Sequence, residues 1–187
     1  MSTSIPNAPY HHGNLRNALL EAALVILERE GEAGLGLRDL ARAVGVSPAA
    51  PYRHFDNRAA LLEALAVTGF QRFTWAMEDV AAANPPDMLA AMGKTYVLFA
   101  LHNAALFRLM FSPRLRRDNR PGLRMAADAA FATLRHVSGG DTRTGRVAAL
   151  AAWARVHGLA VLLLDGQIAL EAGEDIEALI SDIIERH

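Results

Sequence analysis

The sequence contains no cysteine, so neither disulfide bonds nor thiolate-ligated metals contribute to its fold or chemistry. It has a single lysine, Lys94, and a net charge of −1, which argues against a protein that coats nucleic acid indiscriminately. The apolar run Leu159 to Leu164 is far too short to span a bilayer. Residues 1–14 contain no apolar signal-peptide core, so we expect a protein of the cytoplasm that does not enter a membrane.

Familiar catalytic and metal-binding patterns are also missing. The sequence has no G-x-S-x-G, no Walker loop, no H-E-x-x-H and no Cys/His zinc pattern. The adjacent pair His11 and His12 lacks acidic or histidine partners at ligand spacing, so we predict no metal and no cofactor. A helical enzyme using His157 with Asp165 or His102 is one rival interpretation, but no matching nucleophile accompanies these residues. We therefore expect a protein that is not an enzyme.

What the sequence does contain is helical patterning throughout. Hydrophobic residues make up 52% of the 187 positions, enough for a sizeable core, and no alternating apolar/polar run of strand length is present. We predict an all-α protein of about nine helices, with Asn14 capping the first helix and Asn57 capping the fourth. The clearest predicted spans are 15–30, 37–44, 48–55, 57–82, 88–101, 104–111, 142–172 and 176–184.

Residues 35–62 predict two short helices joined by a tight turn. Leu37, Leu40, Ala41 and Val44 fall on one helical face, and Gly45 follows where a helix end favours a residue with positive φ. Ser47 and Pro48 then form an N-cap and first-position pair for a second helix. This arrangement is the helix-turn-helix, which places its second helix in the major groove of DNA.

The segment 14–66 resembles the DNA-binding end of the TetR family of bacterial transcription regulators. The resemblance implies an N-terminal three-helix DNA-binding domain over residues 1–60, with an arm at 1–13. The fourth helix would join it to a helical-bundle domain over 61–187 that binds a ligand and dimerises. The matching residues are Arg38, Leu40, Ala41, Gly45, Val46, Ser47, Tyr52, His54, Phe55, Arg58, Leu61 and Leu62.

The exposed face of the second helix is the one that enters the groove in the family. Arg53 is the only long donor there and is the candidate base reader, while Ala49 and Ala50 can contact thymine methyl groups. Tyr52 and His54 match positions that contact phosphates in the family. The full predicted DNA-contact set is Arg38, Ser47, Pro48, Ala49, Ala50, Tyr52, Arg53, His54 and Arg58.

Two arginines give a separate physical argument for phosphate contact. Arg38 and Arg58 each lie in the first turn of a predicted helix, where the helix dipole disfavours a cation by about 0.3–1 kcal/mol. A nearby DNA phosphate would compensate, although pairing with Asp39 or Glu63 is the simpler alternative.

The sequence departs from the family pattern within this motif. Gly36 replaces a usual Ser or Thr and leaves a weaker cap, and Pro51 replaces a leucine-like residue. Because Pro51 removes only the first intrahelical bond, we predict an irregular first turn rather than a broken helix.

The C-terminal half resembles the Trp-His-Gly type of regulatory domain in the same family. Trp153, His157 and Gly158 carry the resemblance, together with the segment 105–113. In the family such domains dimerise and bind a small effector, and an apolar chamber is one interpretation of the stripes here, with a solid core as the other. The candidate chamber residues are Met92, Tyr96, Phe99, Asn103, Phe107, Met110, Phe111, Phe131, Trp153 and His157.

These patterns predict a homodimeric, ligand-responsive transcription repressor that binds a palindromic operator in double-stranded DNA. Ile176 to Ile184 and the preceding apolar helix exceed what one chain needs to cover, so the last two helices would form the dimer interface. The main alternative is a small-molecule binding protein of the same fold that has lost specific DNA binding. The sequence leaves open the effector, which we expect to be small and apolar or amphipathic, as well as the operator and the regulated genes.

Overall fold

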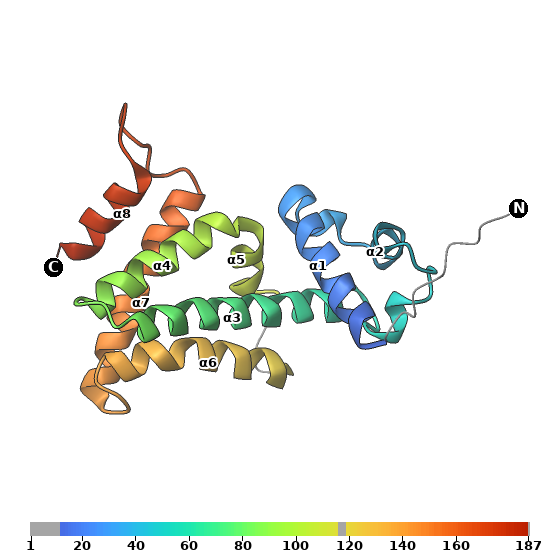
Figure 1. The fold of residues 1–187 in the computed structure, drawn as a ribbon, viewed down its shortest axis with the longest axis horizontal. Coiled ribbons are helices and arrows are strands. Elements are labelled where there is room, and N and C mark those ends of the chain that lie inside the picture. The colour runs from blue at the N-terminus through green and yellow to red at the C-terminus, as the bar shows by residue number, and fades with distance from the viewer. Residues whose placement is uncertain (1–11, 116–118, 187) are drawn as a thin grey trace, which may run out of the picture. The chain divides into compact units, whose positions relative to one another are not determined.

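The structure, a computed structural model, describes residues 12–115 and 119–186 (Figure 1). The all-α prediction is confirmed, and the described residues form eight α-helices and two short 3-10 helices, close to the predicted number of about nine helices. The chain divides into two compact units, Met1–Leu65 and Ala66–His187, and the boundary falls inside helix α3 (Arg58–Ala83). Most of the predicted N-terminal arm, residues 1–11, and the arginines at 116 and 117 lie outside the described residues.

The first unit contains α1 (His12–Glu30), the 3-10 helix η1 (Glu32–Gly34), α2 (Leu37–Val44) and the 3-10 helix η2 (Pro51–Arg53). Helix α1 packs against α2, and Leu19 and Leu40 are fully buried. Helix α1 starts before the predicted position, so Asn14 lies inside it and does not cap it. The start of α3 agrees with the prediction, since Asn57 Oδ1 accepts a hydrogen bond from the Ala60 N–H at 3.0 Å.

The second unit contains most of α3 together with α4 (Met88–His102), α5 (Ala104–Met110), α6 (Pro121–Val137), α7 (Arg143–Leu164) and α8 (Ile176–Glu185). Helix α4 packs against both α7 and α8 (Figure 1). Side chains of Asp87, Thr142 and Asp175 cap α4, α7 and α8 by accepting backbone N–H groups. These caps explain why three helices of this unit begin where they do.

Helix α7 ends at Leu164, well before the predicted end at Ala172. Gly166 adopts a φ of 65°, and the Gln167 N–H bonds back to the Leu162 carbonyl at 2.9 Å, which closes the helix. Arg108 of α5 holds this end, because its guanidinium donates to the Leu164 carbonyl at 2.9 Å and to the Asp165 carboxylate at 2.6 Å. The sequence prediction overlooked the ability of Gly166 to terminate a long apolar helix.

The outer face of α7 is apolar and largely uncovered. Val147 is 59% exposed and Leu162 is 46% exposed, and an added Cβ at Gly158 would meet no other atom within 4 Å. By length and composition α7 is the one helix, among the residues described, that could cross a membrane, and only 17% of its most apolar stretch is buried. The six-residue apolar run did not predict this, because small and apolar residues extend the helix beyond the run.

Candidate functional site

The first candidate surface is built on α2 and the turn that follows it. Leu37, Leu40 and Ala41 anchor α2 in the core of the first unit. At its end Gly45 has a φ of 75°, and the Val46 N–H bonds to the Ala41 carbonyl at 2.9 Å. This left-handed glycine cap turns the chain sharply, as the sequence predicted.

The segment after this turn is not the predicted α-helix over residues 48–55. The Ala50 N–H bonds to the Ser47 carbonyl at 2.9 Å, and the Arg53 N–H bonds to the Ala50 carbonyl at 3.2 Å, so both bonds span three residues. Pro51 has no N–H with which to reach the Ser47 carbonyl, and only the short 3-10 helix η2 forms. The effect of Pro51 is therefore larger than the irregular first turn that we predicted.

Despite its tighter winding, this segment has one buried side and one exposed side. Pro51 and Phe55 are buried, whereas Tyr52 and Arg53 are exposed. The guanidinium of Arg16 lies 5.5 Å from the centre of the Phe55 ring and helps to hold that side down. Ser47, Pro48 and Ala49 are exposed, and Ala50 and His54 are partly exposed.

Arg38 and Arg58 occupy the first turns of α2 and α3 as predicted, but their surroundings differ. The side chain of Arg38 is exposed, and its guanidinium makes no hydrogen bond or ion pair with any residue that the structure describes. The guanidinium of Arg58 donates to the Leu35 carbonyl at 3.0 Å and also to the Glu32 carbonyl. These two carbonyl dipoles account for the position of Arg58 without an external anion.

Replacing Arg58 therefore has a structural cost that replacing Arg38 does not. We expect Arg58→Ala to lower the free energy of unfolding by about 1–2 kcal/mol, because two hydrogen bonds from a charged but exposed group are removed. Arg38→Ala should change it by less than about 0.5 kcal/mol. Urea denaturation followed by circular dichroism measures both, and equal decreases would contradict the structural role of Arg58.

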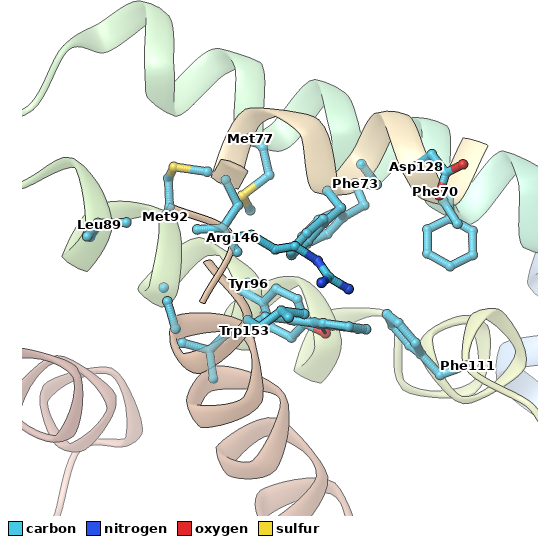
Figure 2. Close-up of a pocket in the computed structure, with 18 residues that line it drawn as sticks. Phe70, Phe73, Met77, Leu89, Met92, Tyr96, Phe111, Asp128, Arg146 and Trp153 are labelled. Carbon is cyan, nitrogen blue, oxygen red and sulfur yellow. Dashed lines mark hydrogen bonds between the residues drawn. The ribbon is translucent and has the colours of Figure 1, made fainter. Parts of the chain in front are cut away.

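The second candidate site is a cavity of about 270 Å³ within the second unit (Figure 2). Aromatic rings form much of its wall, with Phe73 5.2 Å from Tyr96 and Phe131 5.6 Å from Trp153 between ring centres. The residues that line it come from α3, α4, α6 and α7 and from Phe111 after α5. They are Phe70, Phe73, Met77, Leu89, Met92, Gly93, Tyr96, Phe111, Ala127, Asp128, Ala130, Phe131, Leu134, Arg146, Leu150, Ala152, Trp153 and Val156.

Comparison with known proteins decides which family these two sites belong to. The model "Bacterial regulatory proteins, tetR family" matches residues 19–65, and "Tetracyclin repressor-like, C-terminal domain" matches residues 89–187, more than half of the chain. The chain belongs to the TetR family. The first unit therefore carries the helix-turn-helix of a DNA-binding transcription regulator.

Solved structures agree with this assignment to the TetR family. A protein of unknown function from Rhodococcus sp. RHA1 is 35% identical, with a TM-score of 0.80, and the match covers 95% of this chain and 97% of that one. The TetR family regulator PfmR from Thermus thermophilus is 21% identical, with a TM-score of 0.62 and coverages of 90% and 97%. AibR, solved with isovaleryl coenzyme A and operator DNA, is 19% identical, with a TM-score of 0.63 and coverages of 89% and 94%. None of the functionally curated proteins matches the chain.

Half of the predicted chamber residues line the cavity. Met92, Tyr96, Phe111, Phe131 and Trp153 do so. The other five, Phe99, Asn103, Phe107, Met110 and His157, do not line it.

The five that do not line the cavity serve the surrounding structure instead. Phe107 and Met110 are buried in the core, and Phe99 packs its ring 5.3 Å from Phe73. The side-chain amide of Asn103 bonds to the Phe99 carbonyl at the end of α4. His157 lies behind Tyr96, to which it is hydrogen-bonded.

Helix α3 contributes to this TetR-family cavity, although the predicted chamber contained none of its residues. Phe70, Phe73 and Met77 line it and recur at the spacing of one helical face. That spacing is a usable sequence signal, whereas the prediction gave this helix only the role of joining the two domains.

A chain of hydrogen bonds runs from the cavity wall into the protein. The Trp153 Nε1–H donates to the Tyr96 hydroxyl oxygen at 3.1 Å, and the Tyr96 hydroxyl lies 2.7 Å from His157 Nδ1. An indole N–H can only donate, so the Tyr96 oxygen accepts from Trp153, and its own O–H can be donated to His157 in the tautomer whose Nδ1 carries no hydrogen. Burial lowers the pKa of His157 below its usual value, which favours the same neutral form.

The lowered pKa of His157 predicts a pH dependence of stability. The unfolded chain protonates His157 near pH 6.5, before the folded chain does, so the stability from its neutral form is present above about pH 6.5 and is lost below it. We expect the melting temperature of the native chain to fall more than that of His157→Leu between about pH 7.5 and 5.5. An equal fall in melting temperature for the two proteins over this pH range would contradict the lowered pKa of His157.

Proposed function

We propose that this TetR-family chain is a repressor that binds a palindromic operator as a homodimer and is released by a small effector. The observation that carries the proposal is the exposure of residues 47–53 on a turn whose other side is buried through Pro51 and Phe55. The exposed side chains of Tyr52 and Arg53 add little to the core beneath the segment, which leaves them free to contact DNA. We propose that the protein acts in the cytoplasm, where its DNA is found.

The proposed contacts follow the position of each side chain. Arg53 carries the only exposed guanidinium on the segment, which could pair in a bidentate way with a guanine edge, and Ala49 and Ala50 would contact thymine methyl groups. Ser47, Tyr52 and His54 would donate to phosphates, with Pro48 packing against the sugar-phosphate backbone. Arg38, which has no partner in the described structure, would bind a further phosphate. Arg58 would support the segment through the Leu35 and Glu32 carbonyls instead.

Dimerisation through α7 and α8 would cover the exposed apolar face of α7. Val147 and Leu162 are exposed on that face, and Gly158 presents backbone with nothing packed over it. A second copy would bury this surface in a four-helix interface, which gives the apolar composition of α7 a use other than crossing a membrane. Two copies would also present two recognition segments to half-sites about one DNA turn apart.

The effector would bind in the cavity of the second unit and favour a conformation with weaker DNA affinity. It can weaken binding only by its difference in affinity for the two conformations. AibR, a relative by fold, was solved with both isovaleryl coenzyme A and operator DNA, so one protein of this fold binds both kinds of partner.

Selection of binding sites from a random duplex library tests the DNA assignment. We expect enrichment of a palindromic sequence whose half-sites are separated by about one helical turn. Recovery of no sequence above background, together with tight binding of small molecules, would favour the alternative of a binding protein that no longer recognises DNA. The small side chains of Ala49 and Ala50 are the feature that keeps this alternative specific to the chain.

A further inference from the structure

The cavity has an apolar wall whose own polar atoms are already paired. The Trp153 Nε1–H donates to the Tyr96 hydroxyl oxygen, and the Tyr96 hydroxyl is also hydrogen-bonded to His157 Nδ1. A ligand that needed a polar anchor would have to break this chain of hydrogen bonds to use these atoms. The aromatic wall is therefore suited to the apolar body of a ligand rather than to its polar group.

Only two of the lining residues are charged, Arg146 and Asp128, and their side chains point in different directions. Figure 2 shows the Arg146 side chain of α7 extending into the cavity, whereas the Asp128 carboxylate of α6 lies at its edge and points away from Arg146. No ion pair joins them, and neither side chain has a hydrogen-bonding partner among the residues described. The guanidinium of Arg146 is thus the polar group available to a molecule in the cavity.

The sign of this charge selects among ligand classes. A cation would be repelled by the guanidinium. A neutral apolar ligand would displace water from Arg146 without providing hydrogen-bond acceptors in its place. A carboxylate can accept two parallel N–H bonds from the planar guanidinium, and these bonds are charge-assisted.

We propose that the cavity binds an amphipathic organic anion, with its apolar body among the aromatic rings and its carboxylate paired with Arg146. This rests on the proposed role of the cavity as the effector site and names the chemical class of the effector. The preference for an anion comes from one residue of α7, so it can be removed without altering the apolar wall.

Direct binding of matched probes tests the class. The probes are octanoate, 1-octanol and octylammonium, with 4-phenylbutyrate and 4-phenylbutanol as an aromatic pair, measured without DNA. Trp75, which is 61% exposed, is replaced by phenylalanine so that Trp153 in the cavity wall is the only fluorescent indole. We expect at least one carboxylate to bind about tenfold or more tightly than its alcohol, and octylammonium to bind more weakly than octanoate.

Substitutions then assign the preference to Arg146. Arg146→Gln should remove the advantage of the carboxylate and leave the affinity for the alcohol nearly unchanged. Arg143→Gln, on the same helix but outside the cavity lining, is the matched control for the change in charge and should keep the advantage. Asp128→Asn should also keep it.

Several results would overturn the proposal. They are equal binding of each carboxylate and its alcohol, tighter binding of octylammonium, no binding of any probe, or a carboxylate advantage that survives Arg146→Gln. DNA release is measured separately with the same probes. Carboxylate binding without DNA release would keep the ligand class and reject the effector role, whereas failure of the DNA selection would leave the binding result standing.

Discussion

Replacing Arg53 with alanine is expected to lower the affinity for the selected operator by at least about tenfold while hardly changing the affinity for random duplex DNA. One guanidinium-to-guanine pair contributes about 1–3 kcal/mol of discrimination, and a dimer would lose two of them. Arg53 is exposed on η2 and is the only residue of the segment that can form such a pair. Fluorescence anisotropy with operator and scrambled duplexes at one fixed salt concentration measures the effect.

Arg38→Ala is the comparison that separates reading bases from binding phosphate. It should weaken binding to both duplexes by a similar factor, and the slope of log affinity against log salt should become shallower by roughly 0.9 for each phosphate that is no longer neutralised. Arg143→Ala removes the same charge from the second unit and should leave both affinities unchanged. An equal decrease on operator and random DNA for Arg53→Ala would remove its role as a base reader.

A charge placed on the outer face of α7 is the second change with a large expected effect. We expect Leu162→Arg to convert the dimer to monomers and to reduce operator affinity by about a hundredfold or more. An unpaired guanidinium in an apolar interface is costly to bury. Separating the two recognition segments also removes the roughly 10²–10⁴-fold advantage that bivalent binding can provide. Sedimentation velocity gives the oligomeric state, and anisotropy gives the affinity.

Met125→Arg is the matched control, because Met125 on α6 is 69% exposed, more than Leu162 at 46%, and lies outside the proposed interface. It should leave both the dimer and operator affinity unchanged. Gly158→Leu is an independent test of the interface. The single chain has space for the added side chain, but a closely packed partner would not, so this substitution should also weaken the dimer. A Leu162→Arg protein that stays dimeric and binds the operator normally would place the interface elsewhere.

The sequence predicted the helix-turn-helix well where local rules act alone. The apolar face of α2 and the left-handed Gly45 cap are set by residues within one or two turns of each other. The form of the recognition segment was harder to predict, because Pro51 removes a donor and hydrogen bonds that span three residues form on both sides of it, from Ala50 to Ser47 and from Arg53 to Ala50. An isolated proline rule predicts that one bond is missing, but it does not predict how many neighbouring bonds change with it.

The cavity was only partly predictable for a different reason. The apolar stripes on α4 and α7 were visible, but the sequence does not state which residues of a stripe face a void and which face another helix. Phe107 and Met110 fill the core, whereas Phe73 and Met77 of α3 face the cavity. Arg146 was not singled out, because its significance comes from where α7 packs and not from its neighbours in the chain.

The hydrogen bonds from Arg108 to the end of α7 couple the cavity wall to that helix. Helix α5 is linked to α7 at one end through the Leu164 carbonyl and the Asp165 carboxylate, and it is followed directly by Phe111 in the cavity wall. A ligand that displaces Phe111 would therefore also displace the C-terminal end of α7, because α5 connects the two through Arg108. Occupation of the cavity would thus shift α7, the helix that carries the uncovered apolar face.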